Sequence, residues 1–151
     1  MEMDCDREGC MFCTTDQKGV CWNTNATYQI MCKLCKEQKI KASYQGETGR
    51  SLLSRTADHS RGLRLGHSGN PLHEHSLAQH SGQQMTQVDW EVKSTGVYRS
   101  ALERQTAEGV LLHEELARSR AKEGASIMVL NSKLDFHQAG VVHNTPKKEL
   151  K

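Results

Sequence analysis

The chain has 151 residues, of which 36% are hydrophobic and 5% aromatic, and its formal net charge is +2. This length fits one domain with a modest core, and so lean a core often depends on a metal, disulfides or a partner. The small net charge excludes a polycation, so any nucleic-acid binding must come from local clusters of basic residues.

The first ten residues, MEMDCDREGC, are acidic and lack the apolar run of a signal peptide. No stretch of the sequence approaches the roughly 20 apolar residues that a membrane span requires. We therefore expect a soluble, intracellular protein with no membrane partner. Its expected location in the cell is the nucleus. In such a reducing compartment, cysteines serve as metal ligands more often than as disulfides.

The first half of the chain alternates between turn-rich and regular segments. Residues 1–24 are polar and rich in cysteine, with little sign of regular structure. Two β-strands are predicted at 26–32 and 40–46, joined by a lysine-rich turn. The turn formed by residues 46–49 then starts a helix at 50–60, and 61–71, with three glycines and a proline, is predicted to be a loop.

The second half begins with a short helix at 72–81 and a β-like segment at 86–98. The strongest helix signal is the apolar stripe of residues 99–121, and a short apolar run follows at 126–130. The order β-β-α-α-β-α predicts an α+β fold, with a small antiparallel sheet flanked by helices. The expected organisation has three parts: a Cys-rich zinc-knuckle extension (1–24), a main domain (25–143) and a basic tail (144–151).

All six cysteines lie in the first quarter of the chain, and four of them form two C-x-x-C pairs. They are Cys5, Cys10, Cys13, Cys21, Cys32 and Cys35. A C-x-x-C pair turns tightly enough for both thiolates to face one zinc ion. One interpretation joins the two pairs in a single four-cysteine site, which leaves Cys5 and Cys21 unused. Another is that the cysteines are simply reduced and buried.

The interpretation that we favour uses every cysteine in two structural zinc sites. Four thiolates make the first site, namely Cys5, Cys10, Cys13 and Cys21. Cys32 and Cys35 then need two further ligands, and His75 and His80 offer an H-x4-H pair within the spacing of zinc sites with two cysteines and two histidines.

A set of polar residues outside the cysteines has the chemistry for cutting a phosphodiester. Tyr28 and Tyr44 can stand on one face of the predicted hairpin. Arg55 and His59 are separated by four residues and so share a helix face. Arginine binds phosphate oxygens bidentately, and a tyrosine hydroxyl can position or deprotonate water. Glu108, beside the apolar stripe of the long helix, could hold a hard cation such as Mg²⁺ or Mn²⁺ that neutralises phosphate charge.

These residues occur in motifs that resemble the GIY-YIG nuclease domain, in the variety carried by Penelope-like retroelements. The most specific part is YQGETGRSLLSRTADH, from Tyr44 to His59. The first motif corresponds to residues 26–28, the helix with the metal-binding glutamate to 104–108, and the asparagine motif to 130–133. Cys32 and Cys35 between the tyrosine motifs, and the later histidine pair, also match this variety.

The resemblance implies a role for each matching residue. Tyr28 and Tyr44 would orient or activate water, Arg55 would bind phosphate, and His59 would lie close by as a proton-transfer group. Glu108 would hold the catalytic metal, and Asn131 would support the site. Such a domain would nick DNA at the insertion target of the retroelement, fused to or working with a reverse transcriptase.

The sequence departs from the family pattern at Ala26-Thr27 and at Gln45, where glycine and apolar residues are usual. These are scaffold positions, and Gln45 would point away from Tyr44 along an alternating strand. The alternative function is a non-catalytic, zinc-stabilised nucleic-acid-binding module of the same fold. Four arginines in and after the first helix, and four lysines between residues 33 and 41, could supply its contacts with phosphate.

Overall fold

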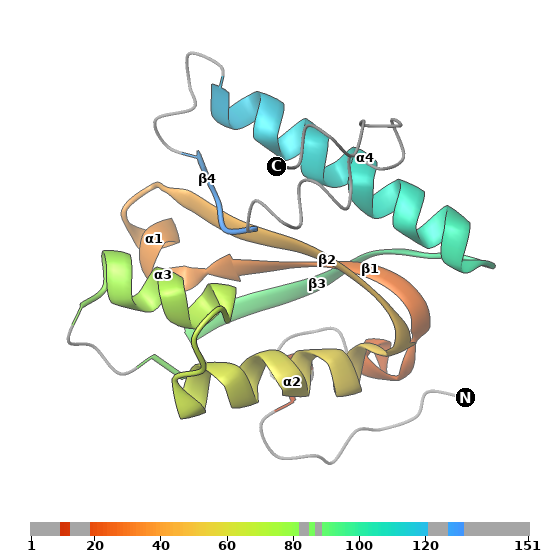
Figure 1. The fold of residues 1–151 in the computed structure, drawn as a ribbon, viewed down its shortest axis with the longest axis horizontal. Coiled ribbons are helices and arrows are strands. Elements are labelled where there is room, and N and C mark those ends of the chain that lie inside the picture. The colour runs from red at the N-terminus through yellow and green to blue at the C-terminus, as the bar shows by residue number, and fades with distance from the viewer. Residues whose placement is uncertain (1–9, 13–18, 82–84, 87–88, 121–126, 132–151) are drawn as a thin grey trace, which may run out of the picture.

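The structure is a computed structural model that describes residues 10–12, 19–81, 85–86, 89–120 and 127–131. Within these residues, four strands form one sheet in the order β3-β1-β2-β4. The strands are β1 (Thr24–Cys32), β2 (Lys41–Ser51), β3 (Trp90–Val97) and β4 (Ile127–Val129). Helices lie on both sides of the sheet (Figure 1), and the predicted α+β class is confirmed.

The sheet is mixed, which corrects the prediction of an antiparallel sheet. β1 pairs antiparallel with β2 and with β3, whereas β4 pairs parallel with β2. The difference arises from the apolar run 126–130, which supplies β4. Since β3 and β4 run in the same direction, they need a crossover connection, and the long helix between them provides it.

The helices are α1 (Lys33–Glu37), α2 (Leu52–Leu65), α3 (Pro71–Gln79) and α4 (Ala101–Arg120), preceded by a short 3-10 turn, η1 (Val20–Trp22). Figure 1 shows α2 and α3 on one side of the sheet and α4 on the other. α1 lies between β1 and β2, so it and β4 are additions to the predicted order of elements.

Helix α2 continues to Leu65, so the predicted loop at 61–71 is wrong over its first five residues. Gly62 misled the prediction because its absent side chain serves packing rather than a turn. A Cβ atom at this position would overlap the side chain of Asn70. The helix ends instead at Gly66, whose φ of 66° is the left-handed conformation that glycine adopts readily at a helix terminus.

Strand β2 is longer than predicted, because it continues through the segment 46–49 that we expected to be a turn. Gly46 pairs with Tyr28, and Thr48 pairs with Ala26. A Cβ atom at Gly46 would overlap the phenol ring of Tyr28. Glycine is therefore needed here for the close approach of a ring, and the strand ends only at Ser51, whose side chain caps α2 by accepting a hydrogen bond from Ser54 N.

The two faces of the sheet differ in chemistry. The face toward α2 and α3 holds apolar and aromatic side chains, including Tyr28, Ile30 and Tyr44, which pack in one core cluster with Leu52 and other residues of the helices. Successive residues of a strand point to opposite faces. The alternate positions therefore face α4, and several of them are buried and polar: Thr27, Gln29, Ser43 and Gln45.

Part of the predicted 1–24 extension packs into this same core. Cys10, Met11, Phe12 and Cys21 are buried and belong to the cluster that contains Tyr28. Residues 1–9 and 13–18 and the predicted tail at 144–151 lie outside the described part of the chain. Among the helices that the structure describes, none is long and apolar enough to span a membrane.

Candidate active site and metal centre

Four of the predicted catalytic residues come together on the α2 side of the sheet. The hydroxyl of Tyr28 lies 2.8 Å from Nε2 of His59, and Nε of Arg55 donates a hydrogen bond to the same hydroxyl at 3.1 Å. The ring of Tyr44 packs edge-on against His59, with 5.1 Å between the ring centroids. β1, β2 and α2 thus contribute to one cluster, which we call the tyrosine cluster (Tyr28, Tyr44, Arg55 and His59).

Local structure explains why these side chains meet. Tyr28 and Tyr44 occupy positions of the same parity in the paired register of β1 and β2, so both point toward α2. α2 begins directly after β2, so Arg55 and His59 lie in its first two turns, close to the strands. Arg55 and His59, four residues apart, then lie one above the other on the helix face that covers the tyrosines.

Burial determines the protonation of the cluster. Burial, reinforced by Tyr44, raises the pKa of Tyr28 far above its usual range. Burial, followed by the charge of Arg55, lowers the pKa of His59 to about 3. Burial also disfavours the charged form of Arg55, but the adjacent phenols of Tyr28 and Tyr44 outweigh it and raise the pKa. At neutral pH, Tyr28 and His59 are therefore both neutral and hydrogen-bonded to each other, and Arg55 beside them is positively charged.

Glu108 comes from a different helix. It lies in α4, on the other side of the sheet from α2 (Figure 1). One turn earlier in α4, the Arg104 guanidinium forms an ion pair with Glu47 and a hydrogen bond with Asn25 Oδ1. Glu47 alternates along β2 with the residues that face α2, so this ion pair fixes α4 to the opposite face.

A magnesium ion does not fit the residues of the tyrosine cluster. The cluster contains no carboxylate, and Mg²⁺ prefers oxygen ligands. Within the described ranges, the one group of three or more histidine, cysteine or acidic side chains that could hold a metal does not include Glu108.

Asn131 lies at the sheet edge, where its side chain extends the β2–β4 ladder. Its Oδ1 accepts a hydrogen bond from Gln45 N at 3.0 Å, and its Nδ2 donates to Gln45 O at 2.8 Å. The amide thus replaces the backbone of a further β4 residue. Gln45 itself is buried, and its side chain donates weakly to Ser43 Oγ at 3.5 Å. Asn131 therefore supports the strand that carries Tyr44.

The second predicted zinc set forms a compact group. Cys32, Cys35, His75 and His80 place one ligand atom each within 4.8 Å of all the others. Sγ of Cys35 lies 3.4 Å from Nε2 of both histidines, and Sγ of Cys32 lies 3.4 Å from Nε2 of His80. Tetrahedral zinc with ordinary bond lengths puts sulfur and nitrogen ligands about 3.5 Å apart. The four side chains therefore fit a zinc ion.

Secondary structure positions the four ligands. Cys32 ends β1 and caps α1, in which Cys35 follows one turn later. His75 lies in α3 and His80 at its C-terminal end. Burial, followed by the nearby His80, lowers the pKa of His75 to about 4, which keeps it neutral as a ligand must be. A zinc ion at this group would join α3 to the β1–α1–β2 connection.

Trp90 supports the metal group from β3. It is paired with Cys32 in the sheet register, and its ring packs edge-on against His75, with 5.7 Å between centroids. The alternation of Val88, Trp90 and Val92 predicted a strand here, but it gave no sign of this contact. Arg104 and Glu47 were likewise missed, since an ion pair that spans 57 residues leaves no local signal.

Only two of the four cysteines in the first predicted zinc set lie within the described residues. Cys10 and Cys21 are buried, but Cys5 and Cys13 lie outside the described residues. The second set has four candidate ligands without Cys10, so the arrangement favours the interpretation with separate sites over a single site that joins the two C-x-x-C pairs.

We compared the chain with known proteins in three ways. No protein-family model matches it, and neither a curated protein nor a solved structure does so.

Proposed function

We propose that this chain is a metal-dependent DNA endonuclease that nicks phosphodiester bonds, in the service of target-site cleavage by a retroelement. The observation that carries the proposal is the bonded series Arg55–Tyr28–His59, assembled from β1 and α2. The motifs shared with GIY-YIG nucleases contain these same residues.

Arg55 is the phosphate-binding group of the proposed site. It is half-buried and stays positively charged. Its Nε–H donates to Tyr28, and the guanidinium also hydrogen-bonds to Tyr44. A guanidinium carries five N–H donors, so those that the two phenols do not use can donate to non-bridging oxygens of a phosphodiester. This binding would align the scissile bond with the hydroxyl of Tyr28.

Tyr28 and His59 would manage the attacking water and its proton. Because burial holds the phenol in its neutral form, Tyr28 orients the water through its hydroxyl at rest. Burial is the main cause that lowers the pKa of His59, and a phosphate bound to Arg55 would offset the second cause, the cationic charge of Arg55. His59 can then accept a proton passed along the hydrogen bond from Tyr28.

Magnesium or manganese, held by Glu108, is the cofactor proposed for this activity. When bound, the ion would neutralise charge on the phosphate and the leaving oxygen. The helix that contains Glu108, α4, lies on the other side of the sheet from α2, so the ion takes no part in the roles proposed for Arg55, Tyr28 and His59. The structural ion is proposed to be Zn²⁺ at Cys32, Cys35, His75 and His80, with a second Zn²⁺ at the four N-terminal cysteines.

Nicking of supercoiled plasmid in the presence of Mg²⁺ or Mn²⁺ tests the proposal. Arg55→Ala and Tyr28→Phe should each lower the nicking rate by at least about a hundredfold, the scale typical of general acid–base and charge-stabilising groups. Arg50→Ala is the matched control, because Arg50 is exposed and pairs with Asp58 outside the cluster. Equal loss in all three variants, or none in Arg55→Ala, would contradict the assignment.

A second candidate function is a non-catalytic, zinc-stabilised nucleic-acid-binding module. Two observations favour it: the Tyr28 side chain is fully buried, and α4, the helix that contains Glu108, lies on the other side of the sheet from α2. Its signature is salt-dependent DNA binding by wild type without nicking under any divalent metal. In that case Arg55→Ala would weaken DNA binding, and neither the wild type nor the variant would nick the plasmid.

A further inference from the structure

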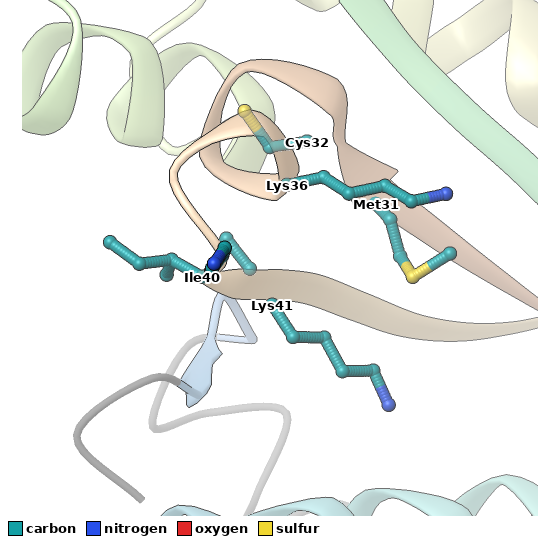
Figure 2. Close-up of a pocket in the computed structure, with 7 residues that line it drawn as sticks. Met31, Cys32, Lys36, Ile40 and Lys41 are labelled. Carbon is teal, nitrogen blue, oxygen red and sulfur yellow. The ribbon is translucent and has the colours of Figure 1, made fainter.

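A pocket of about 290 Å³ lies where β1, α1 and β2 meet (Figure 2). The residues that line it are Met31, Cys32, Lys36, Lys39, Ile40, Lys41 and Ala42. Met31 alternates along β1 with Tyr28 and Ile30, and Lys41 pairs with Glu115 of α4. Met31 and Lys41 therefore lie on the α4 side of the sheet, opposite the tyrosine cluster.

The lining combines an apolar interior with a basic rim. Met31, Ile40 and Ala42 supply apolar surface, and the methylene stems of the three lysines add to it while their ammonium groups reach solvent. Figure 2 shows the nitrogen ends of Lys36 and Lys41 extending away from the α1–β2 connection. No acidic or aromatic side chain lines the pocket.

The positive charge at the rim is only partly compensated. Lys36 pairs with Glu91 at 3.1 Å, and Lys41 pairs with the buried Glu115 at 2.9 Å. Lys39 is exposed, and its ammonium has no ion pair within the described part of the chain. Residues 33–41 contain four lysines and one glutamate, so this end of the hairpin carries excess positive charge.

We infer that this pocket docks an acidic peptide segment of a partner protein, with one apolar side chain in the pocket and carboxylates at the lysine rim. The volume lies just below the range of about 300–1,000 Å³ that suits drug-sized ligands, so it fits one or two side chains. Carboxylates complement the ammonium groups, and such complementarity sets partner choice and association rate.

The same lining argues against a nucleic acid as the occupant. Single-stranded nucleic acids are held by aromatic rings on which bases stack, and the pocket has none. It also lacks an arginine, the side chain that grips phosphate bidentately. The docking surface shares no residue with the tyrosine cluster, so the inference about it does not depend on the nuclease proposal.

Fluorescence anisotropy with the zinc-loaded, full-length chain tests the inference. The probe is a short labelled peptide in which glutamates flank a single leucine, compared with versions that carry alanine for leucine or glutamine for glutamate. We expect saturable binding of the first peptide, weakened about tenfold by either change, a factor that corresponds to about 1.4 kcal/mol. Added salt should weaken it further, since the rim is exposed.

Variants of the chain separate docking from general charge attraction. Lys39→Glu should weaken binding of the acidic peptide about tenfold or more, and Met31→Ala should erase the preference for leucine over alanine. Lys93→Glu is the matched control, because Lys93 is exposed on β3 and does not line the pocket. Circular dichroism of each variant with zinc confirms that it is folded.

Three results would overturn the inference. The first is the absence of saturable binding of the acidic peptide to the folded wild type. The second is equal weakening by Lys39→Glu and Lys93→Glu, which would indicate attraction to overall charge. The third is displacement of the peptide by a single-stranded oligonucleotide that binds this surface more tightly and loses affinity in Lys39→Glu, which would identify a nucleic acid as the occupant.

Discussion

Replacing His80 by alanine should remove zinc from the group formed with Cys32, Cys35 and His75, and destabilise the fold. His80 Nε2 lies 3.4 Å from both cysteine sulfurs, so its loss leaves three ligands for a tetrahedral ion. The ion would otherwise link α3 with the β1–α1–β2 connection, two segments joined by a long stretch of chain. Without it, α3 keeps only its packing contacts.

The size of this destabilisation can be estimated from mass action, because zinc binds the folded state. Free zinc at about 100 times its Kd stabilises the folded state by about 2.7 kcal/mol. For a chain of about 150 residues, each kcal/mol shifts Tm by about 2–4 °C. Loss of this one ion should therefore lower Tm by roughly 5–11 °C. A chelator added to wild type should produce the same shift and have little further effect on His80→Ala.

Differential scanning fluorimetry with metal analysis of the same samples measures both quantities. His67→Ala is the matched control, because His67 is exposed and lies outside the metal group. We expect His80→Ala to hold one zinc fewer than wild type and His67→Ala to hold the same number. If His80→Ala retains both the full zinc content and the wild-type Tm, the assignment of this group as a metal centre is wrong.

Three other predictions concern the tyrosine cluster and the strand beside it. Gly46→Ala places a methyl group in the ring of Tyr28 and should lower the free energy of unfolding by about 1–3 kcal/mol in urea titrations. Asn131→Ala removes two buried hydrogen bonds to Gln45 and should cost about 1–3 kcal/mol by the same measurement. Burial lowers the pKa of His59 to about 3 in the folded state, below the ordinary 6.5 of the unfolded chain, so stability should fall as pH drops from 6.5 toward 3, and His59→Gln should flatten that fall.

Short-range sequence signals predicted much of the arrangement that the structure shows. The C-x-x-C pair and the H-x4-H pair identified the four residues of the metal group, because spacing within a turn or helix limits how ligands can meet. The i, i+4 spacing of Arg55 and His59 placed both over the paired tyrosines. These inferences succeeded where the geometry depends on a few neighbouring residues or on one strand register.

Two of the errors arise from glycines that the sequence suggested were in a turn and a loop. Gly46, Gly49 and Gly62 indicated a turn and a loop, but the structure uses them inside β2 and α2. At Gly46 and Gly62 the reason is a side chain from elsewhere, Tyr28 or Asn70, which occupies the space of the missing Cβ. The sequence shows that a glycine is present, but it does not show which distant side chain packs against it. The parallel edge strand β4 was missed for the same reason, since its partner Lys41 lies far away in sequence.

The placement of Glu108 also depended on long-range structure. The motif resemblance groups it with Tyr28 and Arg55, and the Arg104–Glu47 ion pair holds its helix, α4, on the face of the sheet opposite α2. Helix periodicity gives the face of α4 that packs inward, but it does not say which side of the sheet receives that face.

The central claim is that the chain cleaves DNA with Glu108 as the metal ligand, and one assay measures it most directly. Supercoiled plasmid is incubated with Mg²⁺ and zinc-loaded wild type or Glu108→Ala, and the nicked circle is quantified over time. The account predicts steady nicking by wild type and loss of that activity in a folded Glu108→Ala. Wild type that binds the plasmid without nicking it, or a Glu108→Ala variant that nicks at the wild-type rate, would contradict it.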